Sequence, residues 1–459
     1  MNNLFSSTNR YRLLLCAVTF LATLAACRKL VEIDDPKNQL TPEKVYADTN
    51  AAQGVIANVY ANYERNINPI LNLSLALYAD ELNYFGLNTE TIEFFQSRVS
   101  TGNQRNQSLW ARLYNMVYQC NDLLEKLPVS ENLPDAFRKR VAGEAHFLRA
   151  FAYFHLINLY ENIPIILATD VAASSKTGQS NLAINYAQIE ADLQSAQSLL
   201  NDYPLPHTKT RASYYSATAL LSKVYLYQQQ WPAAAEAANI VINSNLFKLE
   251  HPAEVFKASS AETIFQFWTP QGYNYNTPEL ILTNTNNPQY ALNTQLGTAF
   301  ETDDLRKEHW VGIRSLSNGS NTQVYFYPIK YSNTAADSSD PEYFIYSRLA
   351  DQYLILAEAK AELGDFDACM TALNVLRERA NIQTYSNLSS IELCREAVTR
   401  ERRLELFLES GDRLFDLKRT GKLNEILKAK PLWLPRARNL PIPRNELSSN
   451  RSLIQNDGY

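Results

Sequence analysis

Apolar residues recur at helical spacing through most of the chain, and one segment shows this pattern clearly. Between residues 349 and 362, small and apolar residues follow the 3.6-residue period of a helix: Ala350, Leu354, Ala357 and Ala361. Gly364 then interrupts the pattern, and Asp365 is a residue type that caps helix N-termini. A second stripe follows at the same spacing: Phe366, Cys369, Leu373, Leu376 and Ala380. The segment predicts two helices joined by a tight turn.

A second segment, 219–245, repeats this design 135 residues earlier. Ala219 aligns with Leu354, and Trp231 aligns with Phe366 at the predicted start of the second helix. Small residues where two helices approach, with an aromatic residue at the second start, are typical of tetratricopeptide repeats. Two amphipathic helix pairs could also resemble each other by chance, and the pattern alone leaves this alternative open.

Helical spacing also marks four earlier segments, which we interpret as two weaker pairs: 51–63 with 109–127, and 135–160 with 186–200. The gaps between helices are rich in Asn, Thr, Gln and Tyr: 66–108, 162–183 and 250–341. Loops of this length are usually functional. The sequence therefore predicts a mainly α fold, a tetratricopeptide-like scaffold of about four helix pairs with long irregular insertions.

The N-terminus has the pattern of an export signal. Arg10 and Arg12 precede an apolar run, 13–26, of about 14 residues, which is shorter than the ~20 that a membrane helix needs. The run ends in Leu-Ala-Ala-Cys, which fits the bacterial lipobox, with Cys27 as the lipidated residue. We predict a lipoprotein signal peptide at 1–26; an ordinary signal peptide and a chance match are the alternatives.

Composition narrows the classes of partner. The net charge is −5, and removal of 1–26, which carries two positive and no negative charges, would make it −7. This argues against nucleic acid or anionic lipid as the main partner. The 13 glycines disfavour nucleotide folds built on glycine-rich loops, and the 27 tyrosines predict either tight helix packing or stacking platforms.

Cysteine usage predicts no disulfide framework. Three cysteines follow Cys27 without C-x-x-C spacing: Cys120, Cys369 and Cys394. We interpret them as buried small hydrophobic residues. A bridge between Cys369 and Cys394 remains open.

In its ordered set of motifs the chain resembles the SusD/RagB family, which consists of outer-membrane lipoproteins of Bacteroidetes nutrient-uptake systems. The resemblance covers nearly the whole chain after Cys27 and lies in the order of its motifs: "LVEIDDPKNQLTPEKVY", "LWARLYNMVYQCNDLLEKL", "GEAHFLRAFAYFHLINLYENIPII", "AETIFQF", "DDLRKE", "YSRLADQYLILAEAKAELGDFDACMTALNVLRERA", "RERRLELFLESGDRLFDLKRTG", "LPIPRNELSSN" and "IQNDGY". One departure is Glu161-Asn162, where the family usually has Gly before its Ile/Val-Pro turn.

The resemblance implies a role in nutrient binding without catalysis. Family members sit on the outer membrane through their lipid, face the cell exterior and cover a SusC-like TonB-dependent transporter. They capture an oligosaccharide, or in RagB-like members a peptide, and release it to that transporter. The insertions are expected to form the ligand face. By this resemblance the chain divides into a lipidated tether at 27–50, an N-terminal region at 51–250 and a C-terminal region at 251–459, which includes the insertion 251–341.

Catalytic motifs are missing from the sequence. The five histidines show no metal-binding spacing, and no G-x-S-x-G, Walker or G-x-G-x-x-G motif occurs, so we predict no catalytic residue, metal or cofactor. The best acid/base candidates have spacings of 3, 4, 4 and 3 residues, as on one face of a helix: Arg402, Glu405, Glu409, Arg413 and Asp416. Paired carboxylates could serve a glycoside hydrolase. Flanking arginines lower a carboxyl pKa, however, so an ion-pair ladder that fastens helices is favoured.

Two aromatic-rich segments are the ligand-site candidates. A sugar would be held by aromatic faces and by hydrogen bonds from polar side chains. The segments supply these residues: Tyr84, Phe85, Phe94 and Phe95 from the first, and Tyr273, Asn274 and Tyr275 from the second. Ordinary packing or transporter contact is the alternative for each. Trp268 follows a strand-like run and is expected in the core.

Overall fold

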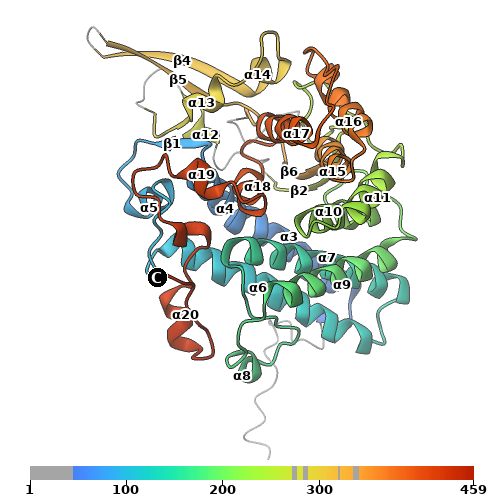
Figure 1. Cartoon of the computed structure of the whole chain (residues 1–459). Coiled ribbons are helices and arrows are strands. Elements are labelled where there is room, and N and C mark those ends of the chain that lie inside the picture. The colour runs from blue at the N-terminus through green and yellow to red at the C-terminus, as the bar shows by residue number, and fades with distance from the viewer. Residues whose placement is uncertain (1–44, 271–276, 283–287, 319–320, 334–340) are drawn as a thin grey trace, which may run out of the picture.

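The fold is built mainly from helices, as predicted (Figure 1). The structure is a computed structural model that describes residues 45–270, 277–282, 288–318, 321–333 and 341–459. The predicted lipidation residue and three ligand-site candidates lie outside the described residues: Cys27, Tyr273, Asn274 and Tyr275.

A row of successive helices forms the scaffold, and each helix packs against the next. The row consists of α6 (Gln104–Lys126), α7 (Asp135–Tyr160), α9 (Leu182–Leu200), α10 (Tyr214–Tyr227), α11 (Trp231–Ile242), α15 (Leu349–Glu362), α16 (Phe366–Arg379) and α17 (Ile391–Glu405). In Figure 1 it bends from the teal helices at the bottom to the orange ones at the upper right. This continuous stack is the predicted tetratricopeptide-like scaffold.

The two repeat-like segments form the expected helix pairs, α10 with α11 and α15 with α16. Trp231 and Phe366 are the first residues of their second helices, as the alignment predicted. Helix α11 lies directly against α15, so the 135-residue repeat is brought side by side although an insertion of about a hundred residues separates the two pairs.

Local residue chemistry explains where these helices begin and end. Ser213 caps α10, and its hydroxyl and that of Ser216 form a reciprocal capping box. Asp365 accepts a hydrogen bond from the Ala368 N–H at 3.3 Å, as expected of a cap. Gly364 adopts a φ of +80°, which most side chains would disfavour, and so reverses the chain between α15 and α16.

Of the two earlier predicted pairs, the second is confirmed, because α7 packs along α9. The first is not, since α6 packs chiefly along α7, and α3 (Thr49–Asn62) makes only smaller contacts with α6 and α7. Gly143 allows the close approach of α7 and α9, because a Cβ there would lie 2.7 Å from Leu200 Cγ.

The expectation of irregular structure throughout 66–108 is also wrong in part. Residues Asn68–Tyr78 form helix α4, which is buried over most of its length. Its buried residues include the polar Asn68, Asn72 and Ser74, so it lacks the clean apolar stripe by which amphipathic helices are recognised.

Glu161, at the end of α7, has a backbone conformation that is typical of glycine. Its φ is +71°, a region that glycine enters readily and other residues at a cost. Its side chain accepts a hydrogen bond from Asn439, and its carbonyl accepts one from Asn185. These contacts from the C-terminal segment and from α9 stabilise a turn that the sequence alone would assign to glycine.

Three two-stranded antiparallel sheets complete the described fold. They pair β1 (Leu82–Tyr84) with β3 (Tyr290–Leu292), β2 (Thr263–Phe267) with β6 (Phe344–Arg348), and β4 (Val311–Asn318) with β5 (Asn321–Pro328). Strands β2 and β6 are buried against α10, while the β4–β5 hairpin projects at the upper left of Figure 1.

Short helices fill the connections. They are the π-helical turn Tyr63–Ile67, α5 (Thr89–Phe95), α8 (Val171–Ser174), α12 (Thr277–Leu280), α13 (Thr294–Gly297), α14 (Leu305–Trp310), α18 (Asp412–Arg419), α19 (Leu423–Leu427), α20 (Arg444–Ser449), and the 3₁₀ turns Leu127–Val129 and Pro435–Arg438.

Aromatic rings fill the centre of the molecule. Phe151 lies within 6.5 Å, ring centroid to centroid, of several buried aromatic and imidazole rings: Tyr63, Phe147, His155, Phe267 and Tyr346. Tight packing therefore accounts for part of the high aromatic content. Cys120, Cys369 and Cys394 are buried free thiols, which confirms the interpretation of cysteine usage.

Within the described residues, no helix combines the length and the apolar character that crossing a membrane requires.

Candidate functional site

Two pairs of aromatic rings, each joining the same two distant insertions, lie where β1, β3 and β5 come together. Tyr84 and Tyr290 are direct cross-strand partners in β1 and β3, with ring centroids 5.0 Å apart. Phe85 stands edge-on to Tyr325 of β5, with centroids 5.8 Å apart and planes at 88°. We call these four residues the aromatic ledge.

The turn after β1 fixes the position of Phe85. Its backbone N–H donates to the Gln289 carbonyl at 2.8 Å, which extends the β1–β3 pairing by one residue. The Tyr84 hydroxyl accepts a hydrogen bond from the Asn88 N–H, while the Asn88 side chain caps α5. Gly86 is required by this geometry, because a Cβ at that position would lie 2.3 Å from the Tyr84 hydroxyl.

The four described ligand candidates differ in exposure. Phe85 is 49% exposed, whereas Tyr84 is buried. Phe94 is fully buried and packs edge-on against Tyr78, and Phe95 is partly buried against the core. The structure therefore brings Tyr84 and Phe85 together and directs Phe94 and Phe95 inward. Their ligand-binding roles remain predictions.

Trp268 is not a core residue, so that expectation is wrong. The strand-like run before it forms β2 and is buried, but Trp268 itself follows the end of the strand and is 48% exposed. It precedes 271–276, the segment that holds the other predicted ligand residues and lies outside the described part.

The β4–β5 hairpin presents further apolar surface. Ile313 and Val324 lie on one face of the hairpin, two register steps apart, and each is at least half exposed. The other face carries Tyr325 and Arg314, which are direct cross-strand partners. Arg314 donates from Nη1 to the Leu282 carbonyl at 2.6 Å and so ties this face to the segment before β3.

A buried cluster of charged residues anchors both ends of the hairpin. We call it the ion cluster: Glu262, Asp304, Arg306, Lys330, Arg348, Arg379, Glu401, Glu405 and Glu409. Arg306 precedes β4 and reaches Glu401 at 2.9 Å, and Lys330 follows β5 and reaches Glu409 at 2.6 Å. Tyr325 of the ledge thus stands on a hairpin whose two ends are fixed by ion pairs.

The chemistry of the ion cluster is structural. Burial alone would raise the pKa of Glu405, but Arg379, Arg348 and Arg306 together hold that pKa well below its usual range. A carboxyl group held ionised in this way cannot donate a proton as a general acid near neutral pH. The predicted ion-pair ladder is therefore confirmed for Glu405 and Glu409.

The prediction that 402–416 form one helical face is wrong. Helix α17 ends at Glu405, and Gly411 adopts a φ of +79° before α18 begins at Asp412. Glu405 and Glu409 enter the ion cluster, while Arg402 pairs with Asp416 at 2.7 Å on another side of the helices.

Lys430 fixes the segment that carries Phe85. Its ammonium donates to the carbonyls of Leu77 and Tyr78 at the end of α4 and of Phe95 at the end of α5, at 2.6–2.9 Å. Ser97 Oγ, at 3.1 Å, shares the three N–H groups with these carbonyls. The partial negative charge of the helix C-terminal carbonyls attracts the ammonium, while burial lowers its pKa to about 7. Lys430 therefore holds the two ends of 79–95 together.

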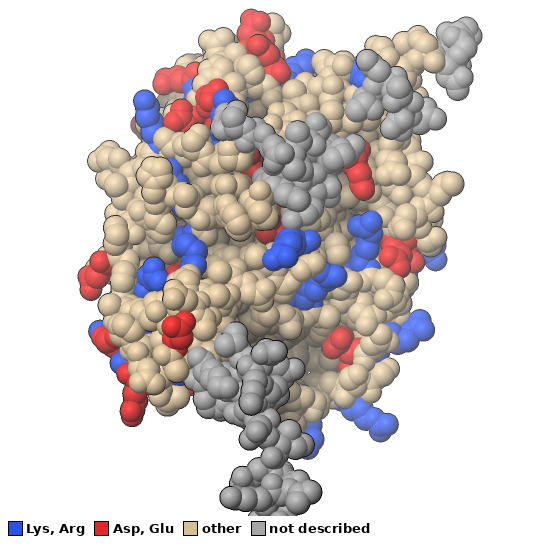
Figure 2. Space-filling view, turned by 180° about the vertical axis from the view of Figure 1, so that it is seen from behind, with Lys and Arg blue, Asp and Glu red and all other residues tan. Residues whose placement is uncertain are grey.

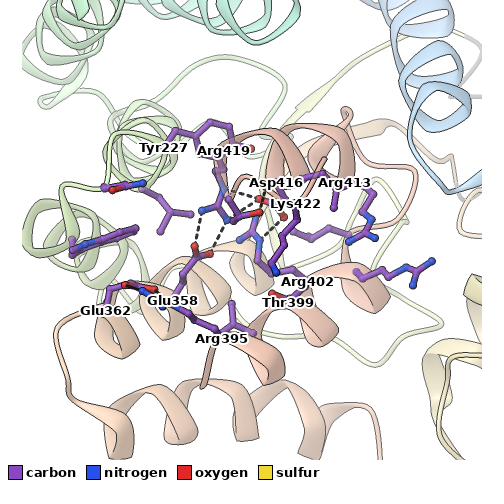
Figure 3. A pocket seen from close by; sticks show the side chains of 18 of the residues that line it. Tyr227, Glu358, Glu362, Arg395, Thr399, Arg402, Arg413, Asp416, Arg419 and Lys422 are labelled. Atoms are coloured by element: carbon purple, nitrogen blue, oxygen red, sulfur yellow. Dashed lines mark hydrogen bonds and ion pairs between the residues drawn. The ribbon is translucent and has the colours of Figure 1, made fainter. Parts of the chain in front are cut away.

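A separate cavity of about 450 Å³ lies among α10, α15, α17 and α18 (Figure 3). We call it the charged pocket. Its basic lining residues are Arg395, Arg402, Arg403, Arg413, Arg419 and Lys422, and its acidic ones are Glu81, Glu358, Glu362 and Asp416. The pocket is distinct from the ledge, since none of the four ledge residues lines it.

The molecular surface fits the weak net negative charge. Figure 2 shows acidic and basic side chains interspersed over a mostly uncharged face. Among the described residues, no three His, Cys, Asp or Glu side chains gather in a geometry that could hold a metal ion.

Tyr290 and Tyr325 are the ledge residues that sequence reasoning missed. Both lie in the tyrosine-rich insertion 250–341, and Tyr325 is part of the run "QVYFYP". That run marks a strand rich in aromatic residues. Its contact with Phe85 spans 240 positions and arises only in the folded chain.

Comparison with family models assigns both halves of the chain. Residues 34–226 match a model described as "Starch-binding associating with outer membrane", and residues 261–459 match the model of the SusD family.

Individual proteins are similar over nearly the full length. SusD-like protein P2 of Formosa agariphila is 26% identical, with 96% of this chain and 98% of the relative covered. A SusD superfamily protein of Bacteroides vulgatus has a TM-score of 0.80 at 23% identity, covering 90% of this chain and all of that one. A laminarin-binding SusD-like protein has a TM-score of 0.74 at 25% identity, covering 90% and 99%.

Proposed function

The chain belongs to the SusD/RagB family, and on this basis we propose that it is a surface lipoprotein that binds a glycan and delivers it to a SusC-like TonB-dependent transporter. The aromatic ledge is the observation that carries the proposal. It offers an exposed ring on a rigid support, at the meeting of the two insertions that sequence analysis selected.

The ledge has the chemistry that sugar binding needs. A pyranose presents an apolar face of C–H groups, which packs well on an aromatic ring, and its hydroxyls require polar partners. Phe85 supplies the ring, and Tyr325 holds its orientation from the side. Tyr273, Asn274 and Tyr275 are proposed to complete the site with further rings and an amide. The name of the laminarin-binding relative supports a glycan over a peptide as the ligand class.

Anchoring and delivery complete the proposed role. Cys27 is proposed to carry the lipid, since two or three acyl chains hold a protein stably at a membrane. The tether would end near α6, where the Tyr46 hydroxyl donates to Asp122 at 2.6 Å. We propose that the protein faces the cell exterior and that the helical scaffold contacts the transporter.

The role is proposed to be non-enzymatic. The strongest carboxylate pair by sequence, Glu405 and Glu409, is buried in the ion cluster, and Glu405 is held ionised there. Release of reducing sugar from any glycan by the purified protein would contradict this part of the proposal.

A glycan array with the full chain tests the ligand. We expect binding to one polysaccharide class, and Phe85→Ala should lower that signal while Val129→Ala, an exposed residue of a 3₁₀ turn, should not. Peptide binding with no glycan signal would assign a RagB-like role instead. Co-purification from solubilised outer membranes tests delivery, because a preparation that never contains a large β-barrel partner would contradict it.

A further inference from the structure

We propose that the charged pocket is a second binding site, specific for a carboxylate-bearing ligand. The site is independent of the ledge and of the proposed glycan ligand. Figure 3 shows its labelled arginines and acids facing a shared space between the scaffold helices and α18.

Three of the four acidic residues of the pocket, Glu358, Glu362 and Asp416, are already occupied by internal ion pairs, Glu362 with Arg395. The fourth, Glu81, accepts a hydrogen bond from the Leu408 N–H, and burial raises its pKa to about 8. Both Asp416 oxygens accept from arginines, one from Arg402 and one from Arg419. Both oxygens of Glu358 accept from Arg419, one of them at 2.7 Å. These pairs neutralise one another, so the remaining donors decide what the pocket can bind.

Arg402 is the principal remaining donor. Its side chain is 3% exposed and lines the pocket, and its Nε donates to Asp416 at 2.7 Å. Its Nη1 and Nη2 atoms donate no hydrogen bond to any group of the described chain. The Asp351 carboxylate forms a longer ion pair with Nη1, at 3.6 Å, which is beyond hydrogen-bond length. The Nε atom of the neighbouring Arg403 also lacks an acceptor among the described residues.

A buried guanidinium with unused N–H groups is stabilised most by acceptors that carry negative charge. Leaving such donors unsatisfied is costly, and hydrogen bonds to an anion are stronger than those to water. The planar guanidinium fork matches the two oxygens of a carboxylate. A carboxylate therefore meets both the geometric and the electrostatic need of Arg402.

The rest of the pocket favours an anion with a carbon skeleton. Arg395 and Lys422 are more than half exposed at the mouth, where Arg395 pairs with Glu362 and Lys422 pairs with Glu425. Leu226, Val398 and Trp231 supply apolar wall between the charges. A volume of about 450 Å³ lies within the range of small-ligand sites and would accommodate one acidic side chain or one uronic acid. These are two sources of the same chemistry, an acidic residue of a docked protein or a free sugar acid.

Calorimetric titration of the full chain in detergent, at low salt, tests the proposal. The probes are sodium glucuronate and N-acetylglutamate, each matched to an uncharged analogue, glucose and N-acetylglutamine. We expect the carboxylates to bind with a Kd of about 1 mM and the neutral analogues at least roughly tenfold more weakly. Tighter binding of glucuronate would indicate a sugar acid, and tighter binding of N-acetylglutamate would indicate an acidic side chain.

Variants locate the binding. Arg395→Gln with Lys422→Gln should weaken carboxylate binding about 3- to 10-fold, and Arg402→Lys about tenfold, because it removes the planar fork. Lys139→Gln is the control, since Lys139 forms an exposed helical ion pair like that of Lys422. Phe85→Ala should have no effect.

Equal binding of acids and neutral analogues, or carboxylate binding unchanged in both pocket variants, would overturn the proposal. If Arg402→Lys fails to fold, the mouth variant still decides.

Discussion

The ion cluster and the aromatic ledge differ in how far their residues are exposed to water. In the cluster, Arg306, Arg348 and Glu405 are removed from water, and each is matched by charges on neighbouring elements. On the ledge, Phe85 leaves half of its ring in water although a packed position would stabilise it. The charges of the cluster are therefore inside, whereas one aromatic ring of the ledge, Phe85, is outside.

We interpret the ion cluster as the support of the fold and the ledge as the binding surface. Buried charges are tolerated only when partners hold them in one geometry, so the cluster specifies how the hairpin and α17 meet. An exposed aromatic ring contributes little to folding stability, and such surface often marks a place where a ligand or partner binds. The two regions are also joined, since both ends of the hairpin that carries Tyr325 enter the cluster. The predictions below test whether loss of stability belongs to the one region and loss of binding to the other.

Glu405→Gln should have the largest effect on stability. It keeps the shape of the side chain but leaves Arg306, Arg348 and Arg379 around a neutral amide. Removing one partner of a buried ion pair costs about 3–5 kcal/mol of unfolding free energy. Urea unfolding followed by circular dichroism measures this loss.

The matched control is Glu425→Gln, whose carboxylate forms an exposed pair with Lys422. This change should leave the unfolding midpoint in place. Equal midpoints for the two variants would show that the ion cluster does not support the fold.

His155, which lies in the core and not on the ledge, should make the free energy of unfolding decrease at acidic pH. It is fully buried, and its Nδ1–H donates to the Phe151 carbonyl at 2.9 Å. Burial lowers its pKa to about 4 from a usual value near 6.5. Above pH 6.5 the imidazole is neutral in both states, so its contribution to stability is complete. As pH falls from 6.5 to about 4, the unfolded chain binds the proton first and stability declines, by up to about 3 kcal/mol.

The measurement is the difference in unfolding free energy between wild type and His155→Phe at each pH. Taking this difference removes the contributions of all other titrating groups, such as the carboxyl group of Glu405. A difference that does not vary between pH 6.5 and 4.5 would contradict the assignment.

Lys430→Met should loosen the base of the ledge without touching its rings. The change removes donors from three backbone carbonyls and should cost about 2 kcal/mol. Hydrogen exchange should rise most in 79–97, and Lys428→Met, an exposed neighbour, should leave exchange unchanged. Uniformly faster exchange over the whole chain would contradict a local role.

The scaffold was predictable because its signal is local. Trp231 and Phe366 mark helix starts by residue type and spacing, and the structure places them so. The missed features depend on distant contacts or on chain reversals that spacing does not reveal. Gly411 breaks the face predicted from Arg402 to Asp416, and Tyr325 meets Phe85 only because the hairpin folds back beside β3. The sequence therefore predicts one half of the ledge, and tertiary packing supplies the other.

Phe85→Ala should have the smallest effect on folding and the clearest effect on binding. Half of the ring is already in water, so its loss should cost the fold no more than about 1 kcal/mol. A sugar stacked on that ring would lose about 1.4 kcal/mol, which corresponds to a roughly tenfold weaker affinity. Titration of the glycan identified on the array measures the affinity, and Tyr325→Phe is the companion variant, because it keeps the supporting ring and removes only a hydroxyl.

The outcome decides where the ligand sits. Weaker binding in Phe85→Ala with an unchanged unfolding midpoint would assign binding to the ledge and support to the ion cluster, as the contrast between them requires. Unchanged affinity, combined with a loss in Tyr273→Ala, would move the site to 273–275. The exposed ring of Phe85 would then be explained by another partner. The opposite face of the hairpin, with Ile313 and Val324, would be the first surface to test for contact with the transporter.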